Sequence, residues 1–535
     1  MHSNLNDLAR TGLGAEDRHL LARVPRLAIS IALAICVYLL VTRVINPGFF
    51  DPLVPTHSDT WRYFAYSKTD FAPSDFQAPR PLMLVALKLM GVFDGFSWFV
   101  AVVLLPAVLL PAILVRTAEL VLGQRAGWCA QAAYYTVCYS LASFYELQTL
   151  DFGGCLAGIA ACATVLAFQR VSRAVQSGTA TLPLHVTPLF LAWISMECKP
   201  TYGLVLAAAP IFFVSAVGRR RVLMQAVSVM AVILLVLVKD RLLGSPFVGV
   251  NAGDGSSYQV GGGLAVMAKT LWFYIGAMLP LWAWPLALMG LWMLWRTHGH
   301  YAALIAVALA ILAVAPMVAI PNNKVAMYSW FGATLLVLPL ILARQVPAGS
   351  PQVKKIAHSA IFWILVACAL VSIARSDQSL RYWYSLNQKS NAQTLKGIDA
   401  LIARSRPGQR ILVAGPLNAH TPFRNDEFIA LRFGYSVDWT VVVPQQHTTL
   451  LPFSDSKRHI ASNEIGNIGE YDVVALFNEE GRLVKLAPAS LYAAVSSGEL
   501  INELFCRQGA RPDKAREQSC LGALEEQAAL SAIGS

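Results

Sequence analysis

The sequence predicts an α-helical polytopic membrane protein with about eleven transmembrane helices and a small C-terminal α/β domain outside the cytoplasm. Three observations lead to this class. Of the 535 residues, 56% are hydrophobic and 14% are charged, whereas soluble proteins carry about 25% charged residues. Apolar runs close to the length that crosses a bilayer recur as far as Ile373. Beyond that point charges become frequent and the long apolar runs stop.

The composition divides the chain into three parts. Residues 1–26 are polar and basic and are expected in the cytoplasm. Residues 27–374 form the predicted transmembrane domain, which includes a first outer loop at 46–80. The apolar run that begins at Leu27 is too long for the core of a signal peptide, so we interpret it as a retained first span. Residues 375–535 form the predicted periplasmic α/β domain.

Each candidate span is an apolar run bounded by charged or polar residues. The candidate spans are 27–45, 96–115, 126–142, 153–168, 184–196, 202–217, 222–238, 272–295, 302–320, 330–342 and 357–373. A shorter apolar run at 81–90 cannot cross a bilayer alone, so it is expected to be an interfacial helix.

The basic residues predict the orientation of the spans. Lys and Arg gather between the spans on one side, and Arg219, Arg220 and Arg221 stand together there. Positive residues mark the cytoplasmic side of membrane helices, so the N-terminus is predicted inside, with the 46–80 loop and the tail outside, in a bacterial inner membrane. The net charge of +11 does not indicate a nucleic-acid partner, because the basic residues punctuate apolar runs and form no single patch. Membrane lipids are the expected surroundings.

The tail alternates runs that are typical of strands with helical patterns, which predicts a small α/β domain. The strand-like runs are 411–415, 439–443 and 472–477, and the helical runs are 379–403 and 489–504. Cys506 and Cys520 lie in its polar end, where a disulfide between them and two free thiols are both compatible with the sequence.

Acidic and aromatic residues concentrate in the first outer loop. Sugar transfer to a hydroxyl needs a base that takes the acceptor proton, and a carboxylate at the membrane face can do so. Aromatic rings suit sugars because their flat faces stack on C–H surfaces. Asp59 is the candidate catalytic base, and its structural alternative is to cap a helix that begins near Thr60. The candidate substrate-binding residues of the loop are His57, Arg62, Tyr63, Asp70 and Arg80.

The pattern Asp59-x-x-x-Tyr63, followed by Arg80-Pro81-Leu82 at the start of an apolar helix, resembles the GT-C superfamily of polytopic membrane glycosyltransferases. The order of the parts is similar too, from the cytoplasmic N-terminus to the outer C-terminal domain. The resemblance implies an inverting transfer of a sugar from a polyprenyl-phosphate donor to a glycan, lipid or protein acceptor of the cell envelope. It implies an acid of the first outer loop as the base, which Asp59 matches best, with Asp51 and Asp70 as alternatives. No cofactor is expected.

A second polar segment, Glu197 to Tyr202, follows a predicted span on the outer side. Lys199 would neutralise the phosphate of a lipid-linked donor, which is the leaving group of the transfer. Alternatively, Lys199 extends to the interface and pairs with Glu197 beside the helix break made by Pro200. Tyr202 is a further candidate substrate-binding residue.

Glu146 and Asp151 flank a stretch that is predicted to be the second outer turn. Their carboxylates would hydrogen-bond sugar hydroxyls or form only the polar turn between two spans. Arg80 would bind a phosphate through two parallel hydrogen bonds or pair with a loop carboxylate. The sequence has no His- or Cys-rich metal spacing and no calcium-loop spacing, so no metal is expected.

Two other functions share some of these features. A transporter or flippase of lipid-linked glycans would place charges near the middle of its spans and show internal repeats, whereas the predicted spans have few such charges. A surface-polysaccharide polymerase or ligase would share the outer-face site and the donor, but a large basic central loop is expected of it. The sequence therefore favours a glycosyltransferase and leaves its donor sugar and its acceptor open.

Overall fold

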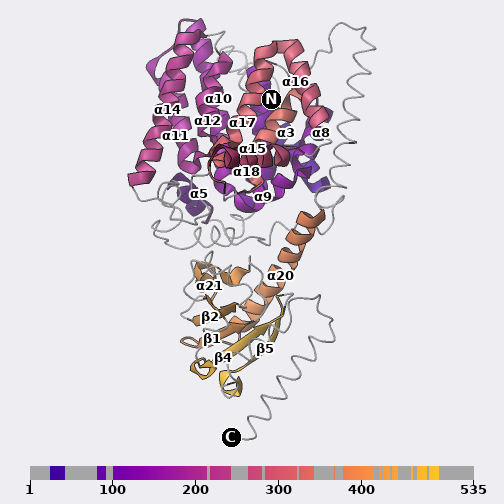
Figure 1. Cartoon of the computed structure of the whole chain (residues 1–535), viewed down its shortest axis with the longest axis vertical. Helices are drawn as coiled ribbons and strands as arrows, with labels where there is room; N and C mark the ends of the chain where they lie inside the picture. The colour runs from indigo at the N-terminus through magenta and orange to yellow at the C-terminus, as the bar shows by residue number, and fades with distance from the viewer. Residues whose placement is uncertain are drawn as a thin grey trace, which may run out of the picture. The chain divides into compact units, whose positions relative to one another are not determined.

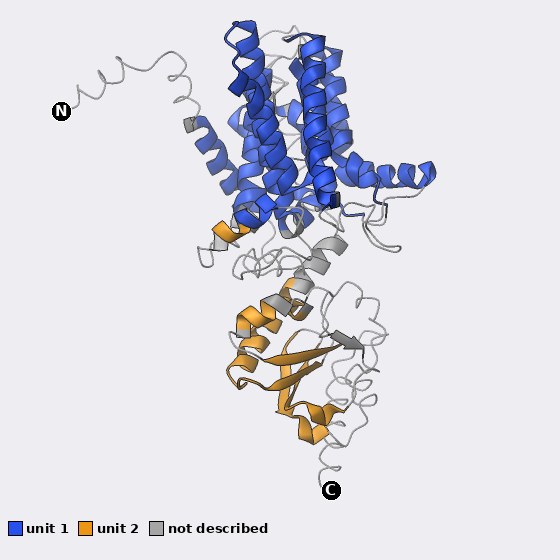
Figure 2. Cartoon of the chain, turned by 90° about the vertical axis from the view of Figure 1, so that its left-hand side faces the viewer, with its two compact units in different colours: residues 1–47, 72–86, 99–378 blue, residues 48–71, 87–98, 379–535 orange. Residues whose placement is uncertain are grey.

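The computed structural model contains a unit of packed helices and a unit built on a five-stranded sheet (Figure 1 and Figure 2). The structure describes residues 24–41, 81–91, 100–123, 125–213, 217–242, 263–279, 283–321, 324–342, 367, 378–414, 421–424, 426–433, 437–443, 459–461, 467–478 and 481–492.

The helical unit contains most of the apolar runs predicted as spans. Its helices are α3 (Val24–Leu39), α5 (Pro81–Gly91, in part), η2 (Val100–Leu109), α7 (Leu110–Leu122), α8 (Trp128–Ser140), α9 (Ala142–Leu150), α10 (Phe152–Gln176), α11 (Leu182–Cys198), η3 (Pro200–Tyr202), α12 (Gly203–Ala208), η4 (Ala209–Phe213), α14 (Arg219–Leu242), α15 (Leu264–Met278), α16 (Trp284–His298), α17 (His300–Val318) and α18 (Met327–Leu342).

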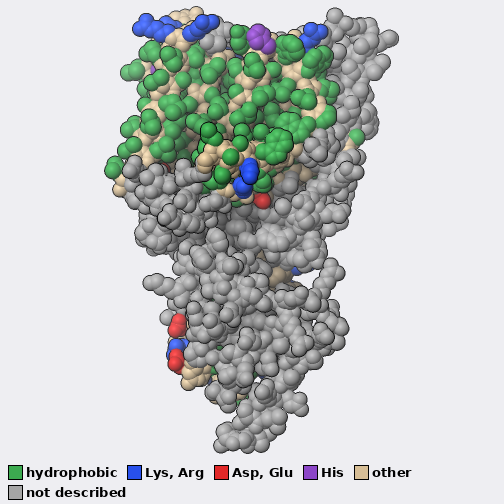
Figure 3. All heavy atoms as spheres, in the orientation of Figure 1, with side chains coloured by type: hydrophobic (Ala, Val, Ile, Leu, Met, Phe, Trp, Pro, Cys, Tyr) green, Lys and Arg blue, Asp and Glu red, His purple; other side chains and the backbone are tan. Residues whose placement is uncertain are grey.

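Several of these helices have the length and apolar composition of membrane-spanning helices. Four described segments are long and apolar enough to cross a bilayer, namely Leu104–Leu122, Phe152–Gln176, Arg219–Asp240 and His300–Val318. Hydrophobic side chains cover the face of the helical unit seen in Figure 3. The coarse class predicted from the sequence is therefore confirmed, but the count of about eleven spans is not. The candidate span at 357–373 lies outside the described residues apart from one helical position.

One predicted span is wrong in detail. The run 272–295 is divided between α15 and α16, and Figure 1 shows α15 lying across the direction of α16. α15 ends at Met278, and Leu279 is extended, with φ −135° and ψ 131°. Leu279 precedes Pro280, and the residue before a proline is disfavoured in the helical conformation. Pro280 therefore accounts for the break. The break was not predicted because the run was identified by its apolar composition, to which proline makes no difference.

The helical unit has two chemically different ends. We call one the basic end, defined by Arg173 in the last turn of α10, Arg219–Arg221 at the start of α14 and Arg296 near the end of α16. Lys, Arg and His side chains line that edge of the hydrophobic surface in Figure 3. The opposite end, which we call the site end, contains Asp151 at the start of α10. At 1.5 Å per residue α10 is about 37 Å long, enough to span the hydrocarbon layer.

The second unit is built on a mixed sheet in the strand order β3-β2-β1-β4-β5. Its elements are α20 (Gln378–Ile402), β1 (Arg410–Ala414), α21 (Asp426–Phe433), β2 (Asp438–Val443), β3 (His459–Ala461), β4 (Val473–Phe477) and β5 (Leu483–Pro488). β1 pairs in parallel with β2, Val413 opposite Val441, and with β4, Val413 opposite Ala475. β3 is parallel to β2, and β5 is antiparallel to β4.

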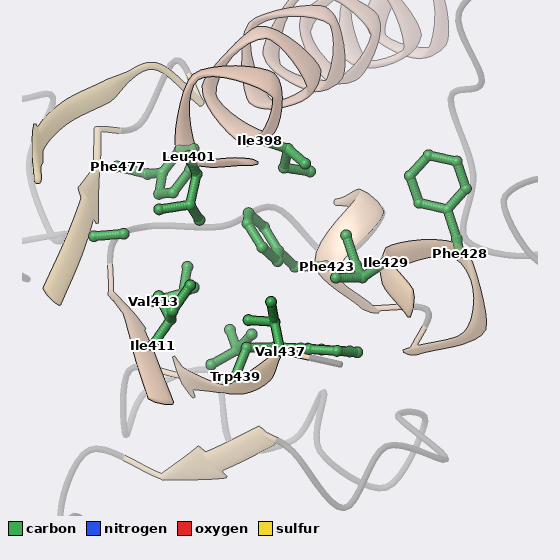
Figure 4. Close-up of a cluster of buried hydrophobic side chains, with 12 residues drawn as sticks. Ile398, Leu401, Ile411, Val413, Phe423, Phe428, Ile429, Val437, Trp439 and Phe477 are labelled. Carbon is green, nitrogen blue, oxygen red and sulfur yellow. The ribbon is translucent and has the colours of Figure 1, made fainter. Parts of the chain in front are cut away.

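Side chains alternate between the two faces of this sheet, as the period of a strand requires. Ile411 and Val413 of β1 face a cluster with Ile398 and Leu401 of α20, and Figure 4 shows these side chains converging with Phe423. Leu412 belongs to a second cluster on the other face. Strands buried on both faces read as continuous apolar runs, which explains why β1, β2 and β4 were predicted close to their observed bounds.

α20 confirms the helix predicted at 379–403, but other parts of the tail depart from the prediction. β3 and β5 were not predicted, and the expected helix at 489–504 is a single 3-10 turn, η10 (Ala489–Tyr492), as far as the described residues extend. Cys506 and Cys520 lie outside the described residues.

Candidate functional site

The site begins at a break between two helices. α9 ends at Leu150 and α10 begins at Phe152, so Asp151 stands between them with φ −122° and ψ 52°. Its carboxylate Oδ1 accepts a hydrogen bond of 2.8 Å from the backbone N–H of Gly154. Asp is a favoured residue at this capping position because its oxygen satisfies a free helix N–H. The stretch from Glu146 to Asp151, predicted as a turn between spans, is instead mostly helical.

Two glycines let other parts of the chain approach the start of α10. A Cβ atom at Gly153 would lie 2.7 Å from Met83 Sδ and 3.0 Å from the carbonyl oxygen of Cys198. A Cβ atom at Gly154 would overlap the Asp151 carboxylate itself. The Gly-Gly pair therefore permits both the cap and the close passage of the neighbouring chain.

A second helix break brings a cation to this carboxylate. α11 ends at Cys198, and Lys199 is extended, with φ −167° and ψ 127°, because Pro200 follows it. The Lys199 Nζ lies 2.5 Å from Asp151 Oδ1, and both side chains are buried. A buried ion pair is not by itself stabilising, but here it holds a positive charge at a fixed point near the site end.

One aromatic ring contacts the pair, and other buried aromatic rings pack at the same end. Lys199 Nζ lies 4.6 Å from the centre of the Tyr328 ring, a distance at which the ring face attracts a cation. The buried Tyr202 packs on Phe331 with 4.5 Å between ring centres. Tyr274 of α15 is also buried, and its side chain hydrogen-bonds to the backbone of Val325, at the turn before α18.

Glu146 positions the start of α18. Its Oε2 accepts a 2.9 Å hydrogen bond from the Met327 N–H, one residue before Tyr328. Burial raises the pKa of the Glu146 carboxyl above its ordinary value, and the N–H groups of Met327 and Ala326 act in the opposite direction. Glu146 therefore acts in this structure as a helix cap that fixes the position of Tyr328.

The structure overturns the suggested pairing of Lys199 with Glu197. Glu197 instead accepts a 2.9 Å hydrogen bond from Trp193 Nε1 and forms an ion pair with Lys239 of α14. Lys239 also lies 3.4 Å from the Asp240 carboxylate. The side chain of Lys239 is 33% exposed, whereas that of Lys199 is 5% exposed, so the two lysines of this end have different environments.

Four sequence-predicted residues thus lie near one another at the site end, on the two segments 146–151 and 199–202: Glu146, Asp151, Lys199 and Tyr202. Tyr328, Tyr274 and Lys239 were missed because they lie within or at the ends of apolar runs. The sequence offered two signals for them: Tyr328 follows Lys324 by four residues, and a Lys-Asp-Arg sequence follows Val238. The remaining predicted residues, Asp59, His57, Arg62, Tyr63, Asp70 and Arg80, lie outside the described residues.

Within the part of the chain that the structure describes, no group of three or more His, Cys, Asp or Glu side chains is placed to hold a metal ion. No family model matches the chain, and no curated protein matches it. What the protein does is therefore inferred from its sequence and from the geometry of the site end.

Proposed function

We propose that the protein is a glycosyltransferase of a bacterial inner membrane, which moves a sugar from a polyprenyl-phosphate donor to a periplasmic acceptor. The observation that carries this proposal is the buried Asp151–Lys199 pair beside the Tyr328 ring. The pair lies at the start of α10, whereas Arg173 lies in the last turn of the same helix. Because positive residues mark the cytoplasmic side, the site end would face the periplasm, where lipid-linked sugars are consumed.

Lys199 is the proposed partner of the donor phosphate. Its ammonium group is buried and held by Asp151, so its charge acts where water screens it little. Asp151 is the partner of Lys199 when no donor is bound, and a donor phosphate would bring further oxygen acceptors to the Lys199 ammonium group. As the bond to the sugar breaks, negative charge grows on that phosphate, and a positioned cation stabilises the transition state more than the bound donor.

The transfer needs one base and no redox step. The acceptor oxygen attacks the anomeric carbon and loses its proton to a carboxylate, while the bond from that carbon to the phosphate oxygen breaks. The bonding electrons leave with the polyprenyl phosphate, and the configuration at carbon inverts. Asp59 is the predicted base. Asp151 is a poorer choice, because its Oδ1 already accepts from Lys199 and from the Gly154 N–H.

A flippase for a lipid-linked glycan is the second candidate, because buried ionisable residues often mark transport paths. The Asp151–Lys199 pair, however, joins the first residue before α10 to the first residue after α11. Transport sites are expected near the middle of the membrane instead. The placement at the helix ends favours chemistry at the surface.

The test compares envelope glycolipids and glycoproteins by mass spectrometry in cells with and without the gene. We expect one glycoconjugate to lose the mass of a sugar on deletion, and Lys199→Gln and Asp59→Asn to reproduce the loss at normal protein levels. Lys239→Gln is the matched control, because Lys239 is a lysine of the same end whose side chain is 33% exposed and a glutamine there can still donate to the Glu197 carboxylate. It should keep the modification.

Each other outcome is decisive. No change of glycan mass on deletion would exclude the transferase, and donor lipid accumulating on the cytoplasmic side would indicate the flippase. Normal modification with Asp59→Asn would show that another residue is the base.

A further inference from the structure

The helical unit also contains an apolar cavity, which is separated from the Asp151–Lys199 pair by the rings of Tyr202 and Phe331. Its volume is about 130 Å³ and it is partly open to the outside of the bundle. The lining side chains come from α7, α10, α12, η4, α16, α17 and α18. They are Leu114, Thr117, Ala118, Val121, Leu122, Ala161, Cys162, Val165, Val205, Phe212, Leu294, Ala306, Leu309, Phe331, Leu335, Leu338 and Pro339.

The cavity extends toward the basic end of the bundle. Leu122, which lines it, is the last residue of α7, and Leu294 lies in the last turns of α16. Ala306 lies in the second turn of α17, which starts at this end. At 1.5 Å per residue, Cys162 is about 16 Å along α10 from Asp151. The lining therefore runs from the middle of the bundle toward the leaflet at the basic end.

The apolar lining of the cavity favours a hydrocarbon ligand. Apart from the Thr117 hydroxyl and the Cys162 thiol, the lining side chains are apolar. An apolar cavity of this size stays dry and takes up hydrocarbon ligands. If it remained empty, its walls would lose the dispersion contacts that a filled space provides. A flexible chain that enters from the bilayer would restore them.

The arginines at the basic end favour a lipid with an anionic head group. Arg170 is exposed and follows Val165 by little more than one helical turn on α10. Arg296 is also exposed, follows Leu294 on α16, and lies 5.8 Å from the centre of the Trp292 ring. Arginines beside an interfacial tryptophan bind the phosphates of anionic lipids. A donor phosphate held at Lys199 would instead be at the other end of α10.

We propose that this cavity binds one acyl chain of an anionic phospholipid whose head group lies among the arginines of the basic end. The binding needs only that the helical unit is embedded in a membrane, and it is independent of the proposed sugar transfer. The phospholipid would fill the bundle from the leaflet opposite the reactive site.

The first test is native mass spectrometry of the full-length protein released from bilayers that contain phosphatidylglycerol. Ala306→Leu adds carbon to a buried lining residue, whereas Ala308→Leu adds the same carbon at an exposed position on α17. Bound phosphatidylglycerol should fall about tenfold with Ala306→Leu, because an overpacked cavity cannot hold the chain. It should stay at the wild-type level with Ala308→Leu. Equal retention in the two variants would overturn the proposal.

The second test uses the wild-type protein and so does not depend on the folding of a variant. Phosphatidylglycerol with a diazirine on one acyl chain should label the peptide that contains Cys162 and not the one that contains Cys155, which lies nearer the site end. A polyprenyl phosphate that carries a diazirine is the competing probe. If only the polyprenyl probe labels the Cys162 peptide, or if neither probe does, the cavity is not a phospholipid site.

Discussion

Lys199 and Asp151 meet across 48 positions of sequence. Their residue types and their predicted outer location indicated a polar site, but no sequence pattern indicated that they pair. Glu197, the nearer acid, was the wrong partner because the two residues lie on different backbone conformations. Glu197 is in the last turn of α11 and reaches Lys239 of α14, whereas Lys199 is extended beyond the end of α11 and reaches Asp151.

Glu146 predicts a pH dependence of stability. Its pKa is raised in the folded protein above the ordinary value of 4.5, so the folded state binds its proton more tightly than the unfolded state. Stability should therefore fall as pH rises from about 4.5 to the folded pKa, and stay level above it. Glu146→Gln keeps an acceptor oxygen for Met327 and removes the titration. Thermal denaturation at several pH values should show that the stability of Glu146→Gln rises relative to that of the wild type as pH rises. A constant difference in stability would contradict a raised pKa at Glu146.

Gly154 offers a second test at the scale of one residue. Gly154→Ala places a Cβ atom on the Asp151 carboxylate, so the cap and the ion pair cannot both keep their positions. We expect a loss of about 1–3 kcal/mol of stability and a marked loss of the proposed transfer, measured by thermal denaturation and by glycan mass spectrometry. Gly127→Ala is the matched control, because a Cβ atom there meets nothing within 4 Å. Wild-type behaviour of Gly154→Ala would show that the cap is not needed.

At the scale of elements, apolar runs located most helices, and the errors have physical causes. A run such as 272–295 contains no charge to mark its division, and the break depends on Pro280. β5 was missed because Lys485 interrupts its apolar residues and Pro488 ends it. β3 has only three residues. Composition thus predicts long buried elements well and short or edge elements poorly.

The junction of α3 with α7 and α8 depends on one carboxylate. Glu119 Oε1 accepts from Arg26 Nη2 at 2.6 Å and from the Ala126 N–H at 2.9 Å, and Oε2 accepts from Arg116 Nη1 at 2.8 Å. Glu119 is buried, so Glu119→Ala leaves two arginines without this partner and should cost about 3 kcal/mol.

Thermal denaturation of the purified protein checks this value. The control is Asp399→Ala, which removes an exposed pair with Arg432 and should change stability by less than about 1 kcal/mol. Equal effects of the two substitutions would show that Glu119 is not a structural junction.

At the scale of the whole molecule, the helical unit separates its charges by end, with arginines at one and the Asp151–Lys199 pair at the other. The positive-inside rule then predicts which end faces the cytoplasm. Lys324, at the turn before α18, and Arg220, at the start of α14, are both exposed and represent the two ends.

Cysteine labelling tests this orientation. In a background without the exposed thiols Cys36 and Cys129, and without Cys368, Cys506 and Cys520, which lie outside the described residues, Lys324→Cys should react with an impermeant maleimide in cells whose outer membrane alone is opened. Arg220→Cys should react only after the inner membrane is permeabilised. The reverse pattern would place the site end in the cytoplasm and remove the basis for periplasmic transfer.

The most direct measurement is the binding of polyprenyl phosphate to the purified protein in lipid nanodiscs, for wild type, Lys199→Gln and Lys239→Gln. A charge-assisted contact to phosphate predicts a Kd at least about tenfold weaker for Lys199→Gln and nearly unchanged for Lys239→Gln. Unchanged binding by Lys199→Gln, or an equal loss in both variants, would contradict the assignment of Lys199 to the donor phosphate.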